Sequence, residues 1–153
     1  MKLVIGCDDV ALSLKNTIKD YLERTRNIEF VDVGVFSETD KELYPRVAEK
    51  AVTIICNKSN EVEYGILLCG TGIGMALSAN KFKGIKAAVC HDVYSAERAK
   101  KSNNTNVITM GARVIGPEVA KKMIDIWLDS EFAGGGSTSK IAVIEQFEKD
   151  NFR

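Results

Sequence analysis

A cysteine followed by a glycine-rich turn is the segment of this sequence best suited to chemistry. Cys69 ends an apolar run, and Gly70, Gly72 and Gly74 follow it. Glycines let backbone N–H groups approach an anion, and a helix that starts there adds its partial positive charge. The segment predicts an oxyanion or phosphate cradle, with Cys69 as a base or nucleophile whose thiolate the helix N-terminus favours. Two plainer interpretations stay open: a tight turn that needs glycine only for its φ angles, and a small buried hydrophobe.

Further polar groups come directly after other strand-like segments. Asp8 and Asp9 follow the first such segment, His91 follows the fourth and Arg113 the fifth. The two acids either contact a sugar hydroxyl or cap the next helix. His91 is the only histidine, so the chain holds no multi-histidine metal site and offers one imidazole as acid or base.

Nucleotide and metal sites are the rival interpretations. The chain contains no GxxxxGK[ST] motif, and its glycines miss GxGxxG because position 75 is Met, so dinucleotide binding in a small oxidoreductase module is a weak rival. A zinc site is a second rival, because three cysteines and the histidine end predicted strands, but no local ligand pair supports it. These four residues are Cys7, Cys69, Cys90 and His91.

Short β-branched segments alternate with segments of helical period, a pattern that predicts βαβ units and a parallel sheet. Strands are expected at 2–7, 28–33, 64–69, 86–90 and 106–110, and helices at 12–24, from 45, 72–81, 94–101, from 117 and after 139. Ligands bind at the carboxyl ends of such strands. We therefore predict a single Rossmann-like, doubly wound α/β domain over residues 1–153, with a five-stranded parallel sheet and a C-terminal helix that reaches toward a partner subunit.

Composition narrows the functional classes. The chain has 153 residues, 45% of them hydrophobic, and its 21 basic side chains balance 21 acidic ones. A neutral protein lacks the basic field that holds nucleic acid or anionic lipid, so neither is an expected partner. No apolar run approaches the ~20 residues that span a bilayer. Four cysteines without a CxxC pair and the absence of a leading apolar segment predict a reduced, cytoplasmic protein.

Three collinear stretches carry a resemblance to a known family. They read GCDD, ILLCGTGIGMALSANKFKGIKAAVC and YSAERAKKSNNTNVITMGARVIGPEVA. Together they resemble the sugar-phosphate isomerases of the ribose-5-phosphate isomerase B and galactose-6-phosphate isomerase family. The resemblance implies aldose–ketose isomerisation through a cis-enediolate, without metal or organic cofactor, in a homodimer or homotetramer with shared active sites.

The same resemblance implies roles for individual residues. Cys69 matches the base, and Thr71 relays a proton between the two substrate oxygens. The amides of the turn meet the developing negative charge; they belong to Gly70, Gly72, Ile73 and Gly74. The other substrate-binding positions are Asp8, Asn103, Tyr44, His91 and Arg113, the last assigned to the neighbouring subunit and to the phosphate.

Three departures from the family pattern bear on the substrate. Asp9 replaces a histidine on the phosphate side with a carboxylate that would repel a dianion. Ser102 stands where ribose-5-phosphate isomerases have a histidine credited with ring opening. The stretch 134–140 replaces GGRHxxR and leaves Lys140 as its cation, a point charge in place of a bidentate fork.

Loss of the ring-opening histidine is harmless for a sugar that forms no ring. A tetrose 4-phosphate has its O4 esterified and closes no furanose, and the SNN and GGGS pattern is similar to the branch that handles erythrulose 4-phosphate. We therefore expect the conversion of erythrulose 4-phosphate slightly ahead of that of ribulose 5-phosphate. The aldose of the second pair, ribose 5-phosphate, keeps its O4 free and is mostly cyclic, so its ring would open spontaneously or with help from His91. A silent sugar-phosphate-binding subunit and a galactose-6-phosphate isomerase subunit are the alternatives.

Overall fold

The computed structural model describes residues 1–57, 59 and 61–152, and their strands form one five-stranded parallel sheet. The strands are β1 (Lys2–Cys7), β2 (Glu29–Asp32), β3 (Val62–Cys69), β4 (Ala87–Val89) and β5 (Val107–Gly111). Their order in the sheet is β2-β1-β3-β5-β4, and each neighbouring pair is parallel. The predicted α/β fold with five parallel strands is confirmed.

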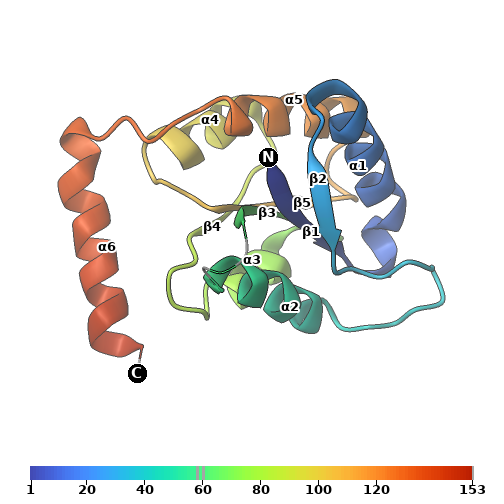
Figure 1. The fold of residues 1–153 in the computed structure, drawn as a ribbon, viewed down its shortest axis with the longest axis horizontal. Coiled ribbons are helices and arrows are strands. Elements are labelled where there is room, and N and C mark those ends of the chain that lie inside the picture. Colours follow the sequence, from blue (N-terminus) through green and yellow to red (C-terminus); the bar gives the residue numbers. More distant parts are fainter. Residues whose placement is uncertain (58, 60, 153) are drawn as a thin grey trace.

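Helices cover both faces of this sheet (Figure 1). They are α1 (Leu12–Arg26), α2 (Tyr44–Cys56), α3 (Ile73–Ala79), α4 (Val93–Lys101), α5 (Pro117–Leu128) and α6 (Thr138–Asn151). Helices α1, α4 and α5 lie on one face and α2 and α3 on the other, while α6 stands to one side of the sheet. This arrangement leaves the carboxyl ends of the strands uncovered by helix α6.

Two predicted boundaries are wrong. Helix α3 ends at Ala79 and not near 81, because the Asn80 side chain pairs with the backbone of Ala87, accepting from its N–H at 2.8 Å and donating to its carbonyl at 2.9 Å. This pairing also blocks part of the exposed edge of β4. The last helix, expected after residue 139, begins at Thr138, directly after a 3₁₀ turn at Gly135–Ser137.

Alternate residues of β1 point to opposite layers of the core, as the two-residue period of a strand requires. Leu3, Ile5 and Cys7 pack in the layer of α1, α4 and α5, whereas Val4 packs with α2. Cys69 belongs to this second layer. Cys7 and Cys69 are therefore on opposite faces of the sheet, although their strands are neighbours.

The four cysteines have different environments. Burial raises the pKa of Cys7 to about 12 and that of Cys90 to about 11. A cysteine on a predicted helix, such as Cys56, is expected to be a small buried hydrophobe. This expectation is wrong, because Cys56 is exposed at the last position of α2 and its thiol donates to the Lys83 carbonyl at 3.4 Å. Among the described residues, no helix is long and apolar enough to cross a membrane.

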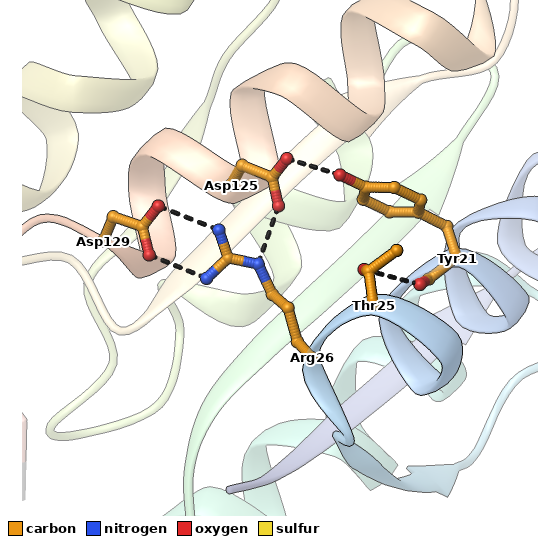
Figure 2. A network of polar contacts seen from close by, with 5 residues as sticks. All are labelled: Tyr21, Thr25, Arg26, Asp125 and Asp129. Atoms are coloured by element: carbon orange, nitrogen blue, oxygen red, sulfur yellow. Dashed lines mark hydrogen bonds and ion pairs between the residues drawn. The ribbon is translucent and has the colours of Figure 1, made fainter.

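A charged clamp joins α1 to α5 (Figure 2). The Arg26 guanidinium donates from Nε to Asp125 at 2.8 Å, and from its two terminal nitrogens to both oxygens of Asp129 at 2.7 and 2.8 Å. The Tyr21 hydroxyl donates to the other oxygen of Asp125 at 2.6 Å. Hydrogen bonding to Asp125 raises the pKa of Tyr21, and the pairing with Arg26 lowers the pKa of Asp129. The bidentate geometry fixes the two helices relative to each other.

A buried lysine at the far end of the sheet predicts a pH-dependent stability. The Lys100 ammonium lies 3.3 Å from the ring centroid of Tyr64 and 4.6 Å from that of Trp127, and donates to the Thr105 carbonyl at 3.3 Å. Burial lowers its pKa to about 8, from 10.5. The unfolded chain therefore binds more protons between these two values, and this lysine's contribution to stability rises with pH across that window.

The Lys100→Met variant isolates this contribution, because methionine fills similar space and does not titrate. One pKa unit corresponds to about 1.4 kcal/mol, so the unfolding free energy of the wild type relative to Lys100→Met should rise by about 3 kcal/mol from pH 8 to 10.5. Urea unfolding at several pH values measures this difference, and the opposing contributions of Cys7 and Cys90 cancel in it. A constant difference would mean that Lys100 stays charged in the folded state.

Candidate active site

Cys69 lies at the point where the chain connections of the sheet change direction. The chain passes from β1 to β2 on one side, and β3 pairs with the other side of β1. Such a switch point leaves a crevice at the carboxyl ends of the strands, where ligands bind. Cys69 ends β3 there with only 4% of its surface exposed. Its Sγ accepts the Gly72 N–H at 3.1 Å, and this bond fixes the position of the sulfur.

The turn after Cys69 rests on the end of β5. The Ala112 N–H donates to the Cys69 carbonyl at 2.9 Å, and the Arg113 N–H donates to the Gly70 carbonyl at 3.1 Å. The buried Thr109 hydroxyl adds a 2.9 Å bond to the Gly72 carbonyl. A hydroxyl inside the otherwise apolar run VITM is the sequence signal for this support, and the sequence argument overlooked it.

Two glycines make this close contact between the turn and β5 possible. Gly72 has a φ of +77°, and a Cβ there would lie 2.9 Å from the Met110 backbone. A Cβ on Gly111 would lie 2.6 Å from the Cα of Thr71. Both positions exclude larger residues, so the plain turn interpretation holds for Gly72 alongside any anion binding. Gly111 was not among the predicted site residues.

The Thr71 side chain and two amides of the turn already have hydrogen-bond partners within the turn. The Ile73 N–H donates to the Thr71 Oγ1 at 3.3 Å, which leaves the hydroxyl proton free to be donated. The Gly72 N–H is used by the Cys69 sulfur. Two of the amides expected in the anion cradle therefore orient the turn's own side chains. The N–H groups of Gly74 and Met75 lie in the first turn of α3, where amides have no intrahelical acceptor.

The position of Tyr44 explains why residue 74 of the turn is a glycine. It is the first residue of α2, and its ring occupies the space beside Gly74. A Cβ on Gly74 would lie 2.5 Å from two ring carbons of Tyr44 and 2.9 Å from its hydroxyl oxygen. The structure thus brings Tyr44 to the turn as expected, and gives Gly74 a packing role that the glycine pattern did not reveal.

The two aspartates after β1 have separate partners. Asp8 caps the short 3₁₀ turn by accepting the Ala11 N–H at 3.2 Å, and burial raises the pKa of its carboxyl. Asp9 pairs with Lys41 of the loop between β2 and α2, and this hydrogen bond lowers the pKa of Asp9. The Lys41 charge offsets the carboxylate that was expected to repel a dianion. Lys41, like Thr109 and Gly111, was not among the predicted site residues.

Arg113 lies over the turn of its own chain. Its side chain is close enough to Gly70 that a Cβ there would be 3.6 Å from Cδ and 3.8 Å from Nε. Its positive charge also reaches Asp8 and opposes the upward shift of the Asp8 pKa. The resemblance assigned this arginine to a neighbouring subunit, whereas here the same chain places it beside Cys69 and Thr71.

His91 is brought to the same edge of the sheet from the end of β4. The half-buried ring accepts the Gly111 N–H on Nε2 at 2.9 Å. An accepting nitrogen carries no proton, so the neutral ring holds its proton on Nδ1. His91 can therefore take a proton only by giving up its bond to β5.

Two predicted residues lie away from this cluster. Asn103 follows α4, whose chain runs back from the carboxyl end of β4, and it precedes β5, which spans five residues, or about 16 Å. It lines a groove of about 700 Å³ between β4 and α6, together with Cys90 and Phe147. Lys140 is exposed in the first turn of α6. Within one chain, neither residue is part of the Cys69 cluster.

The described residues do not form the zinc site that was considered as an alternative. Among residues 1–57, 59 and 61–152, no three His, Cys, Asp or Glu side chains are close enough to hold a metal ion. The placement of Cys7 and Cys69 in opposite core layers is the reason.

Comparison with known proteins gives one consistent result. Residues 3–144 match the family model described as Ribose/Galactose Isomerase. The chain is 51% identical over 151 residues to ribose-5-P isomerase B of Listeria innocua, covering 99% of each chain. It is 50% identical over 148 residues to D-erythrulose-4-phosphate isomerase of Pectobacterium atrosepticum, covering 97% of this chain and 95% of that one.

A solved structure shows the same fold. Ribose-5-phosphate isomerase B of Clostridium thermocellum superposes with a TM-score of 0.91 at 37% identity, covering 98% of this chain and 99% of the other. The likeness therefore extends over nearly the whole chain and includes the elements that position the Cys69 cluster.

Proposed function

This chain belongs to the ribose/galactose isomerase family, and we propose that it interconverts a short ketose phosphate and its aldose through an enediolate, with Cys69 as the base. The observation that carries the proposal is the Cys69 sulfur, held by the Gly72 amide beside the Thr71 hydroxyl. We take residues 1–153 to act as one isomerase domain. Four free cysteines suit a reducing compartment, and we propose the cytoplasm.

The proposed reaction needs only proton transfers. The Cys69 thiolate removes a proton from C1 of the ketose, the C–H electron pair forms the C1=C2 bond, and the carbonyl oxygen becomes an oxyanion. Thr71 donates its hydroxyl proton to this oxygen and accepts one from O1. The Cys69 thiol then returns its proton to C2, and C1 becomes the aldehyde. No electron leaves the substrate, so these steps need no redox cofactor, and in keeping with the family resemblance we propose the reaction without metal or organic cofactor.

The developing charge is met by groups of the turn. The Gly74 amide is in the first turn of α3 and has no intrahelical acceptor, and we assign it and Gly70 to the cradle. The amides of Gly72 and Ile73 hold the Cys69 sulfur and the Thr71 hydroxyl in place beside it. Asp8 and Tyr44 hold the hydroxyl groups, while Arg113 binds the phosphate. Asp9, already paired with Lys41, borders the phosphate side.

The proposed chain length of the sugar depends on whether His91 has a basic nitrogen free to assist ring opening. Ring opening of a pentose phosphate needs a base for the anomeric hydroxyl, and the basic nitrogen of His91 is occupied by Gly111. Ser102 provides no substitute. We therefore propose erythrulose 4-phosphate ahead of ribulose 5-phosphate. The two relatives named for these substrates are 50% and 51% identical, so identity does not decide between them.

A proton NMR time course in D2O tests the function directly. Purified protein is given erythrulose 4-phosphate, ribulose 5-phosphate and tagatose 6-phosphate separately. Deuterium entering C1, with the aldehyde or its hydrate appearing, establishes the enediolate reaction and names the chain length. A clear preference for the pentose would overturn the tetrose proposal. Absence of exchange with all three would favour a silent binding subunit, and tagatose turnover a galactose-6-phosphate isomerase subunit.

We further propose a homodimer, or a tetramer built from it, with shared active sites. Asn103 and Lys140 are separate from Cys69 within one chain, so they would contribute to the site of a second copy. Helix α6 exposes apolar residues that support such a contact: Val143 at 50%, Ile144 at 47% and Phe147 at 61%, the last two of which line the groove between β4 and α6.

Subunit complementation tests the shared site. Cys69→Ala and Asn103→Ala should each be strongly impaired alone. Co-expressed in equal amounts, half of the dimers are mixed and each has one intact site, so about a quarter of wild-type activity should return. Light scattering of the purified sample reports the assembly. If the mixed sample is no more active than its parents, each site is built within a single chain.

The phosphate contacts predict unequal effects of two substitutions. Arg113→Ala should raise KM by about 10- to 100-fold, because a guanidinium makes two parallel bonds to a phosphate and each bond to a charged group is strong. Lys140→Ala should raise KM only a few-fold, since an exposed ammonium is a solvated point charge. Initial rates over a range of substrate concentrations measure both. A larger rise in KM for Lys140→Ala than for Arg113→Ala would place the phosphate-binding site near α6.

A further inference from the structure

The end of β5 supplies three consecutive amides to the site, and only one of them bonds to a side chain. Ala112 and Arg113 donate to the carbonyls of Cys69 and Gly70 at 2.9 and 3.1 Å. Gly111 donates to the His91 Nε2 at 2.9 Å. The two ends of this short segment are therefore held by different partners: the catalytic turn on one side and the imidazole at the end of β4 on the other.

Gly111 transmits any movement of this segment to the turn. A Cβ at Gly111 would lie 2.6 Å from the Cα of Thr71, 2.7 Å from its carbonyl carbon and 2.8 Å from the Gly70 carbonyl oxygen. The turn backbone therefore occupies the space that a side chain at position 111 would need, and the two backbones are in contact in a close-packed interior. A shift of Gly111 consequently displaces Thr71 and the carbonyls that anchor Cys69.

We propose that His91 is a positioning residue for the isomerase: its neutral Nε2 holds Gly111 and thereby keeps Cys69 and Thr71 in their reactive arrangement. The proposal rests on the function proposed above and adds to it a role for the ring nitrogen that faces Gly111. It removes His91 from the acid–base steps, since a protonated imidazole has no acceptor left for the Gly111 amide. The Nδ1–H is then the only polar edge that His91 can offer to a substrate oxygen.

The single histidine makes the hydrogen bond directly observable. Ring nitrogen NMR on uniformly 15N-labelled protein reports the tautomer without assignment, because His91 is the only histidine in the chain. We expect, at pH 8, an unprotonated Nε2 and a protonated Nδ1. The opposite tautomer would overturn the proposal, because a protonated Nε2 cannot accept the Gly111 amide.

Two substitutions separate positioning from chemistry. In His91→Gln the side-chain carbonyl can still accept the Gly111 N–H, whereas His91→Leu has no acceptor. Because a misplacement of about 1 Å costs roughly 100-fold in rate, His91→Leu should lose about 100-fold in kcat with KM changed less than about 3-fold. His91→Gln should recover most of the loss. The rates use the sugar phosphate that the wild type converts in the D2O assay.

Asp92→Ala is the matched control on the same loop. Its carboxylate caps α4 by accepting the Ser95 N–H at 2.7 Å, and within the described part of the chain it makes no hydrogen bond to β5. Loss of a cap lowers the melting temperature by a few degrees, and kcat should stay within about 2-fold of wild type because the β5 platform is untouched. This variant shows how much of the His91→Leu effect comes from destabilising the loop.

The outcomes are distinct. A His91→Gln variant as impaired as His91→Leu would mean that the imidazole itself takes part in the chemistry, and wild-type kcat in His91→Leu would mean that Gly111 needs no such support. Either result overturns the positioning role while the isomerase stands. If the wild type exchanges no deuterium into any sugar phosphate, the proposed function itself fails, and the positioning role for that reaction fails with it.

Discussion

Cys69→Ala should reduce deuterium exchange at the substrate carbon by at least about 100- to 10,000-fold, the range that a positioned acid or base contributes. The thiol is the proposed base for both proton transfers at carbon, and alanine has no proton acceptor. The fold should be retained, because Cys69 ends its strand and its backbone bond to Ala112 does not depend on the side chain. Exchange measured by NMR in D2O, beside a circular dichroism spectrum, tests both expectations.

Cys56→Ala is the control for cysteine chemistry in general. Cys56 is exposed at the end of α2, and its thiol donates to the Lys83 carbonyl, away from the Cys69 turn. Its replacement should leave exchange unchanged. Turnover in Cys69→Ala at the wild-type rate would remove Cys69 from the mechanism and direct attention to Asp8, whose pKa is raised by burial.

Trp127→Ala should destabilise the fold by about 3–5 kcal/mol, the cost of truncating a large buried aromatic residue. Trp127 is fully buried on α5, packs edge-on against Tyr64 with ring centroids 5.7 Å apart, and donates from Nε1 to the Thr105 hydroxyl at 2.9 Å. Its ring also faces the Lys100 ammonium. Because domains of this kind are stable by only about 5–15 kcal/mol, this one change removes a large share of the total.

Urea unfolding followed by circular dichroism measures the loss, since Trp127 is the only tryptophan and its fluorescence disappears with it. Trp127→Phe is the matched variant. It keeps an aromatic ring against Tyr64 and loses the Thr105 bond, so it should cost less than the alanine substitution. A loss below about 1 kcal/mol for Trp127→Ala would mean that α4 and α5 close the cavity by relaxing.

Local periodicity was sufficient to predict the elements. Leu14, Ile18 and Leu22 recur at helical spacing and are buried on α1 as expected. On α5 the helical spacing of apolar residues predicts that Val119 is buried as well, and this is wrong, because Val119 is 44% exposed. The buried stripe begins one residue later, at Ala120, and continues at the spacing of three, four and seven residues that one helix face requires.

The amino-acid sequence by itself determined the α/β class, the location of the strands and the cysteine–glycine turn, because these depend on residues adjacent in the chain. The three-dimensional fold alone placed β5 between β3 and β4, and with it the contacts of Thr71 with Gly111 and of Gly111 with His91. It also paired Asp9 with Lys41 and left Asn103 apart from Cys69. Strand pairing depends on contacts between segments that are distant in the chain. The local pattern of side chains does not determine the energies of these contacts.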